Sequence, residues 1–193
     1  MLSFVLNSGL IVTMDDATRR TLYNFLRRAE LAFREYEAAS RATAAYIANP
    51  NPDAVSEYIV AIGHWESFLA QAYQAWCLLA RGQKILFQPR DGSVMQRLHL
   101  LYNRSKHAES AITSQQLPPD GTLPVWLEND GLHRVEAALT FSEMADVLED
   151  LARFADGAQS PITMREAVMA AYAQSPITMR EAVMAAYADR DSA

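Results

Sequence analysis

Asn49-Pro50-Asn51-Pro52 separates two long stretches of helical periodicity and decides the fold of the first part of the chain. Proline cannot continue a helix and pushes the residue before it toward extended backbone, so one helix must end and another begin here. Apolar residues recur at steps of three and four from Leu22 to Ile47 and again from Val55 to Leu79. A short link between two amphipathic helices predicts an antiparallel helical pair.

Capping patterns define the helices that follow. Ser93, with Gln96 three residues later, is typical of a capping box and predicts a third helix that runs to about Ile112. Thr140 with Glu143 repeats this pattern and predicts the start of another helix.

A turn pattern lies between these two helices. Asp130-Gly131 stands between the short apolar runs 125–127 and 132–135. It favours a β-hairpin with a type I′ turn, in which both central residues have positive φ. The expected fold class is therefore all-α, an antiparallel helical bundle with long first two helices, a small β-hairpin insertion and a short helical C-terminal tail.

The expected organisation has three parts. Residues 1–13 form an N-terminal arm or a mis-assigned start, residues 14–157 form the helical domain, and residues 158–193 form a tail. The tail contains the same sequence twice, at 159–173 and 174–188. Solenoid repeats need about three copies to bury a core, so this repeat is interpreted as a recent tandem duplication or an artefact. The alternative is a pair of partner-binding helices.

Composition favours a cytoplasmic globular protein. Cys77 is the only cysteine, and we expect a buried, inert thiol, which fits a reducing compartment. Residues 1–13 are apolar but lack a basic leader and are too short to cross a bilayer, so we expect no membrane partner. Neither a phosphate-binding glycine loop nor a nucleophile elbow is present, and we expect no cofactor.

Positive charge is concentrated in one window of this acidic chain, whose net charge is -6. Residues 81–107 contain six basic residues, including both lysines, against Asp91 alone. Such a patch favours binding of a polyanion, whereas chance clustering of solvated side chains is the plainer interpretation.

The third predicted helix presents a polar face inside this window. At about 100° per residue, its apolar side consists of Val94, Leu98, Leu101, Ser105, Ala108 and Ile112. The opposite side consists of His99, Asn103, Lys106, His107 and Ser110, with Arg104 at its edge.

This polar face has the groups that phosphodiester cleavage requires. A histidine can act as general acid or base near neutral pH, and Arg104 and Lys106 can stabilise an anionic transition state. The alternative is an ordinary solvated face. His99 and His107 lie about 12 Å apart along the helix axis, too far to chelate one ion, so no metal ligand is assigned.

The segment Leu101-Tyr102-Asn103-Arg104-Ser105-Lys106-His107, which follows two long antiparallel helices, resembles the motif of the HEPN superfamily. That motif is an arginine, usually followed by a polar residue such as asparagine, with a histidine four to six residues after the arginine. Asn103 and His107 match the polar residue and the histidine, but Tyr102 stands at the arginine position. Either Arg104, three residues before His107, substitutes for it, or the chain resembles the non-catalytic members. The resemblance covers about residues 15–112.

Many HEPN proteins are metal-independent ribonucleases of toxin–antitoxin or phage-defence systems, with one active site formed by two copies of the chain. The resemblance implies a homodimer that cleaves or binds RNA, in which His107 is the acid or base, Asn103 orients it or the substrate, and Arg104 contacts phosphate. Further substrate-binding candidates are Lys106, His99, Arg97 and Tyr102. Glu66 is a candidate for orienting the imidazole, from its position on the second helix. The alternative is a non-catalytic protein-interaction or structural module with a cognate protein partner.

Overall fold

The computed structural model describes residues 15–48, 55–80, 86–114, 117 and 123–157. Within these residues the chain is mostly helical, with five helices and a small three-stranded antiparallel sheet. The N-terminal arm at 1–13 and the repeated tail segments at 159–173 and 174–188 lie outside the described residues. No helix within the described ranges combines the length and apolar character needed to cross a membrane.

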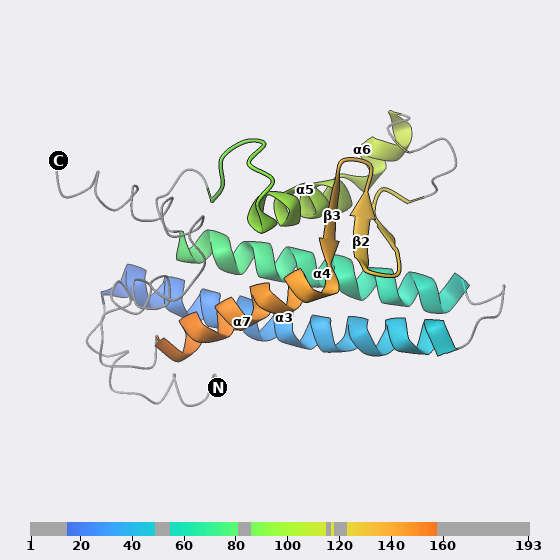
Figure 1. The fold of residues 1–193 in the computed structure, drawn as a ribbon. Coiled ribbons are helices and arrows are strands. Elements are labelled where there is room, and N and C mark those ends of the chain that lie inside the picture. The colour runs from blue at the N-terminus through green and yellow to red at the C-terminus, as the bar shows by residue number, and fades with distance from the viewer. Residues whose placement is uncertain (1–14, 49–54, 81–85, 115–116, 118–122, 158–193) are drawn as a thin grey trace.

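Two long helices, α3 (Asp16–Ala48) and α4 (Val55–Leu79), confirm the predicted pair. They lie side by side and run in opposite directions (Figure 1). Asp15 caps α3, because its Oδ1 accepts from the main-chain N–H groups of Ala17 at 3.0 Å and Thr18 at 2.9 Å.

Aromatic side chains fill the space between α3 and α4. Trp65 and Phe68 are buried, and the ring of Tyr36 packs edge-on against Trp65 with centroids 5.3 Å apart. The indole Nε1 of Trp65 donates to Thr43 Oγ1 at 3.0 Å, which satisfies its polar group inside the core. Cys77 was expected to be buried, but it is exposed, because Trp76 and Leu79 take the core side of this turn of α4.

The predicted third helix is two helices, α5 (Val94–Lys106) and α6 (Ala108–Thr113). Ser93 caps α5 as expected, since its hydroxyl accepts from Gln96 N–H at 3.2 Å. His107 lies at the junction with φ -109° and ψ 31°, outside helical geometry. The break changes the phase of the following turn, so Ile112, assigned above to the apolar side, is 52% exposed and Ala111 is buried instead.

The sheet consists of β1 (Trp126–Leu127), β2 (Gly131–Arg134) and β3 (Ala137–Thr140), in that order and antiparallel throughout. The hairpin of β1 and β2 confirms the prediction, whereas β3 was not predicted. A hydrogen bond from Leu127 N–H to the Tyr58 hydroxyl, at 3.0 Å, connects the sheet to α4.

The predicted type I′ turn is wrong, because positive φ occurs among the described residues only at Arg90 and Gly92. Gly131 is required for a different reason. A Cβ at this position would lie 2.2 Å from the main-chain oxygen of Leu139 on β3. Only glycine therefore allows β2 and β3 to approach this closely.

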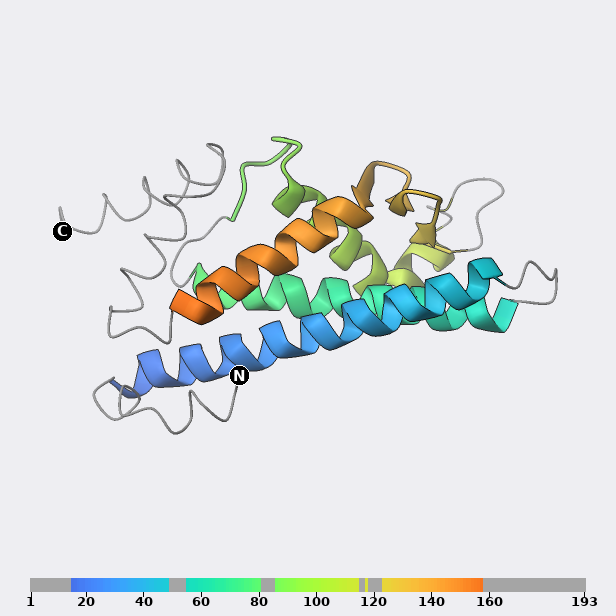
Figure 2. The same ribbon diagram turned by 60° about the horizontal axis from the view of Figure 1, so that its bottom comes forward.

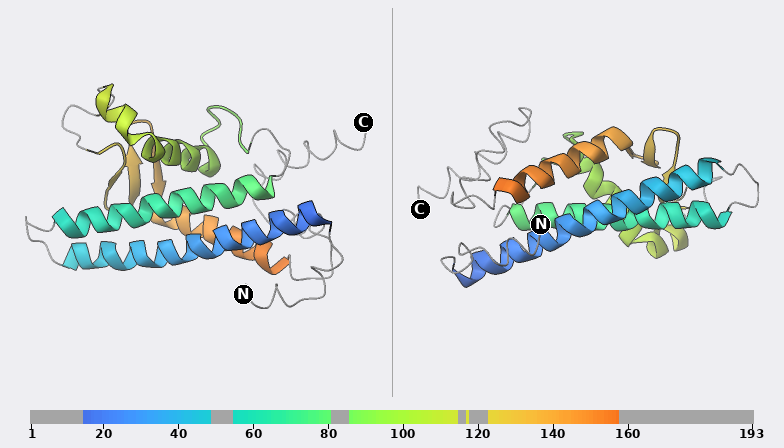
Figure 3. Two further views of the ribbon diagram at one scale, coloured as in Figure 1. Left: turned by 180° about the vertical axis from the view of Figure 1, so that it is seen from behind. Right: turned by 90° about the horizontal axis from the view of Figure 1, so that it is seen from below.

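The last described helix, α7 (Phe141–Gly157), crosses the α3–α4 pair obliquely (Figures 2 and 3). The predicted capping box is present, since Thr140 N–H donates to Glu143 at 3.0 Å and Glu143 N–H donates to the Thr140 hydroxyl at 3.2 Å. Its buried side chains join the common core, where Phe154 packs edge-on against Trp76. The common core thus holds α7 against α4. The sheet and α5 are held in place by packing against these two helices.

Candidate functional site

An open cavity of about 550 Å³ lies where α5, α6 and the turn after β2 meet. The helical wall includes Asn103, Arg104, His107 and Ser110, the end of β2 contributes Arg134, and the turn after it contributes Val135 and Glu136. The structure therefore brings together the three residues that the sequence proposed as catalytic, His107, Asn103 and Arg104, on one surface. The volume lies in the usual range for a ligand site.

His107 reaches this cavity because the helix breaks at it. Its main-chain N–H still donates to the Asn103 carbonyl at 3.0 Å, and its carbonyl accepts from Ala111 N–H at 3.1 Å. The residue is thus anchored on both sides while its side chain is exposed. An exposed imidazole on a rigid support can exchange protons with a molecule in the cavity.

Asn103 is positioned by His99, the second histidine of the polar face of α5. The side-chain nitrogen of Asn103 lies 2.8 Å from Nε2 of His99. The His99 ring is enclosed by Tyr73 and Phe87, each with its centroid 5.0 Å away, and burial lowers the pKa of His99. In the neutral tautomer that carries its proton on Nδ1, which is buried without a hydrogen-bond partner, Nε2 accepts from the Asn103 amide and holds it in one orientation at the cavity wall.

Arg134 is a cavity residue that sequence reasoning missed. Its side chain is only 8% exposed, Nη1 donates to the Leu100 carbonyl at 2.9 Å, and Nη2 donates to Glu136 at 2.5 Å. Burial lowers the pKa of Arg134, Glu136 opposes that change, and the nearby positive charge of Arg104 adds to it. Two guanidinium groups therefore share this wall.

A sequence signal for Arg134 existed. Alternate residues of a strand share a face, so Arg134 belongs to the same face as Leu132, which is fully buried. An arginine in the buried register of a strand is unusual unless it has partners there. That pattern marks Arg134 as a residue with a specific role once the register is known.

Five predicted site residues lie outside the cavity lining, namely His99, described above, and Arg97, Tyr102, Lys106 and Glu66. Arg97 bonds to Glu143 on α7 and to the Ala138 carbonyl on β3. The Nζ of Lys106 lies 6.0 Å from the ring centroid of Tyr102, which itself stacks on Tyr73. Burial raises the pKa of Glu66, and the Ser105 hydroxyl donates a hydrogen bond to it, which works in the opposite direction.

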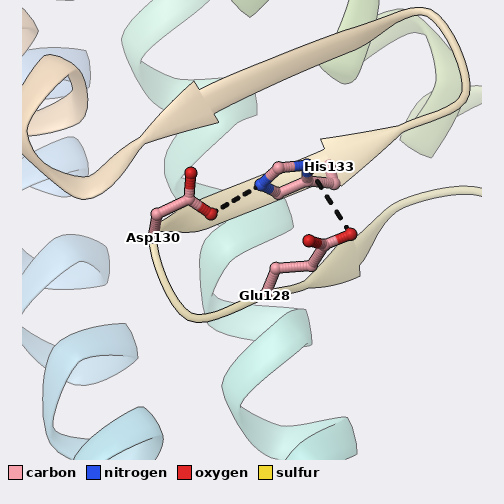
Figure 4. A group of neighbouring side chains, drawn as sticks. All are labelled: Glu128, Asp130 and His133. Carbon is pink, nitrogen blue, oxygen red and sulfur yellow. Dashed lines mark hydrogen bonds and ion pairs between the residues drawn. The ribbon is translucent and has the colours of Figure 1, made fainter.

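A second polar cluster lies on the hairpin, where Glu128, Asp130 and His133 converge (Figure 4). Their potential metal-binding atoms all lie within 4.8 Å of one another. His133 Nε2 is 2.8 Å from Asp130, and Nδ1 is 3.7 Å from Glu128. Both ring nitrogens already face carboxylates, so a cation would have to replace these contacts, and the cluster is accounted for as polar contacts within the turn.

No protein family, curated protein or solved structure matches the chain. Its function therefore has to be inferred from the chemistry of the cavity.

Proposed function

We propose that this protein is a HEPN-like helical bundle that binds RNA in the cavity and cleaves it without a metal ion. The observation that carries the proposal is that Asn103, Arg104 and His107 line one open cavity. These residues supply an amide, a permanent positive charge and an imidazole. That set matches the needs of a phosphodiester whose charge increases in the transition state.

In the proposed reaction, the imidazole of His107 takes the proton of a ribose 2′-hydroxyl while that oxygen bonds to phosphorus. The bond from phosphorus to the 5′ oxygen breaks, and this oxygen leaves with a proton that an imidazolium returns. Arg104 stabilises the charge on the phosphoryl oxygens, and Asn103, held by His99, orients the substrate or the imidazole. The products are a 2′,3′-cyclic phosphate and a free 5′-hydroxyl.

A homodimer completes the proposal. The cavity is open and His107 is exposed at a helix junction, so a second copy facing it would bring a second imidazole to the same phosphate. One imidazole could then accept a proton while the other donates one. A cytoplasmic toxin or phage-defence role is the setting that the HEPN resemblance suggests.

The test is incubation of the purified protein with single-stranded RNA in the presence of a chelator. We expect cleavage by the wild-type chain and its loss in His107→Ala. His64→Gln is the matched control, because His64 pairs with Glu35 between α3 and α4 and is not a cavity residue. Cleavage that His107→Ala retains, or that the chelator abolishes, would contradict the proposed mechanism.

A second candidate function is a non-catalytic protein-interaction module. Ile47 at the end of α3 and Val55, Ile59 and Val60 at the start of α4 are all more than half exposed. Exposed apolar side chains gathered at one end of a helical pair are typical of a protein-binding surface. Ile59→Glu should then reduce association with the cognate protein partner and leave RNA binding unchanged.

A further inference from the structure

We infer that Arg134 and Arg104 form an oxyanion site for a phosphodiester of RNA, and that the Glu136 carboxylate occupies this site when RNA is absent. The inference rests on the proposed function, because it names the group that the cavity binds. It adds two residues that the sequence motif does not contain, Arg134 and Glu136.

The first argument is the incomplete pairing of Arg134. A guanidinium stays charged and carries five N–H donors, so burying one requires several acceptors. Nη1 has the Leu100 carbonyl and Nη2 has Glu136, but Nε is buried without a partner. The side chain is therefore held in place by one main-chain contact and still has donors to offer.

The second argument is the charge on this wall. Arg104 and Arg134 line the same cavity, and the positive charge of Arg104 contributes to the lowered pKa of Arg134. Like charges at short range repel, and an anion between them removes that repulsion. Guanidinium groups match the oxygen geometry of phosphate, to which they donate two parallel hydrogen bonds.

The third argument is the mobility expected of Glu136. Its carboxylate bonds to Nη2 at 2.5 Å, yet its side chain is 67% exposed whereas that of Arg134 is almost fully buried. An exposed glutamate can rotate away from a fixed arginine at little cost. Its carboxylate then gives up its position to a phosphate with the same charge and acceptor geometry, and Nε gains access to the new anion.

The size of the cavity admits more than a free phosphate. At about 550 Å³ the space exceeds a single phosphate and admits a nucleotide unit. His107 and Asn103 line the remaining wall, where the sugar next to the phosphate would lie. Together with the proposed function, this space corresponds to single-stranded RNA bound through one phosphodiester.

The experiment measures binding without cleavage, using a short 2′-O-methyl RNA and the full-length protein. We expect Arg134→Gln to weaken binding roughly tenfold, as for loss of a charged hydrogen-bond partner. Glu136→Gln should strengthen binding by roughly threefold or more, because the competing carboxylate is gone. Arg153→Gln is the control, since Arg153 pairs with Glu149 and Asp150 on α7 away from the cavity.

Opposite effects of the two cavity variants would support the site, and thermal melting establishes that Arg134→Gln is folded. Glu136→Gln alters an exposed side chain, so weaker or unchanged RNA binding by this variant would overturn the inference even if Arg134→Gln does not fold. Inorganic phosphate should compete better than chloride at equal ionic strength, and equal competition would also overturn it. A mononucleotide that binds as tightly as the RNA would overturn the assignment to a phosphodiester.

These outcomes separate the inference from the proposed function. Wild-type RNA binding with the expected variant effects, but no cleavage of ordinary RNA, would support the oxyanion site and refute the nuclease. Cleavage that needs His107 but is indifferent to Arg134 and Glu136 would support the nuclease and refute the oxyanion site.

Discussion

The guanidinium of Arg97 on α5 bonds both carboxylate oxygens of Glu143 on α7, at 2.9 Å and 2.5 Å. Arg97 also donates to the Ala138 carbonyl on β3, so one side chain joins a helix, a strand and a second helix. Both partners are about one-quarter exposed, and their contacts are therefore only partly screened by water. This pair fixes α5, which carries the candidate site, against the rest of the core.

Replacing Arg97 by methionine should lower the free energy of unfolding by about 1–3 kcal/mol, because Glu143 loses charged hydrogen bonds at a partly buried position. Chemical denaturation measures the change. Arg153→Met, which removes the pairs of this surface arginine with Glu149 and Asp150 on α7, should lower the free energy of unfolding by less than Arg97→Met does. If Arg97 instead binds substrate, Arg97→Met would weaken RNA binding and leave the free energy of unfolding nearly unchanged.

The same contact predicts an acid-dependent loss of stability. The hydrogen bond from Arg97 holds the pKa of Glu143 below its ordinary value of 4.5, aided by the bonds from Thr140. A carboxyl with a lowered pKa stabilises the folded state above its unfolded pKa, and this contribution falls as the pH drops below about 4.5. Glu143→Gln should therefore flatten the stability profile in this range, and an unchanged slope would contradict the assignment.

His99 predicts a second pH effect at a higher range. Burial lowers its pKa from 6.5, so the unfolded chain binds the proton more readily than the folded one. The neutral His99 side chain therefore makes its full contribution to the stability of the folded state above about pH 6.5. This contribution decreases as the pH falls below that value. His99→Phe keeps an aromatic ring between Tyr73 and Phe87, and thermal melting from pH 7.5 to 5.0 should show a smaller decline in this variant than in the wild-type chain.

Alanine substitutions at two glycines should change the stability of the fold in opposite directions. Gly131→Ala should destabilise the protein by about 1–3 kcal/mol, because the new methyl would meet the Leu139 carbonyl and force β2 from β3. Gly63 lies within α4 with no atom within 4 Å of an added Cβ, so Gly63→Ala should stabilise by about 0.5–1 kcal/mol. An unchanged or higher denaturation midpoint for Gly131→Ala would contradict this account of Gly131, and a lower midpoint for Gly63→Ala would contradict the account of Gly63.

Local sequence signals predicted the elements that local chemistry controls. The prolines at 50 and 52 and the apolar periodicity predicted α3 and α4, and the two capping boxes placed the starts of α5 and α7 at the correct residues. The break at His107 has neither proline nor glycine beside it, so periodicity gave one continuous helix. Residues of β3 have weak strand propensity, and their pairing with β2 comes from tertiary contacts rather than local preference.

Only the helical part of the candidate site could be predicted from the sequence. Asn103, Arg104 and His107 share one stretch of chain, so a helical wheel was enough to place them together. Arg134 comes from a different element, and its approach to Arg104 depends on the packing of the sheet against α5. Arg97 was assigned to substrate from its charge alone, because its partner Glu143 lies 46 residues away in sequence.

The most direct test of the central claim uses a short RNA with a single ribonucleotide among 2′-O-methyl nucleotides, incubated with the wild-type protein and a chelator. The account predicts cleavage only at that ribonucleotide, a 2′,3′-cyclic phosphate on the upstream product, and at least a hundredfold slower reaction in His107→Ala, as expected for loss of a general acid–base group. Intact RNA with the wild-type chain, or equal cleavage by His107→Ala, would contradict it.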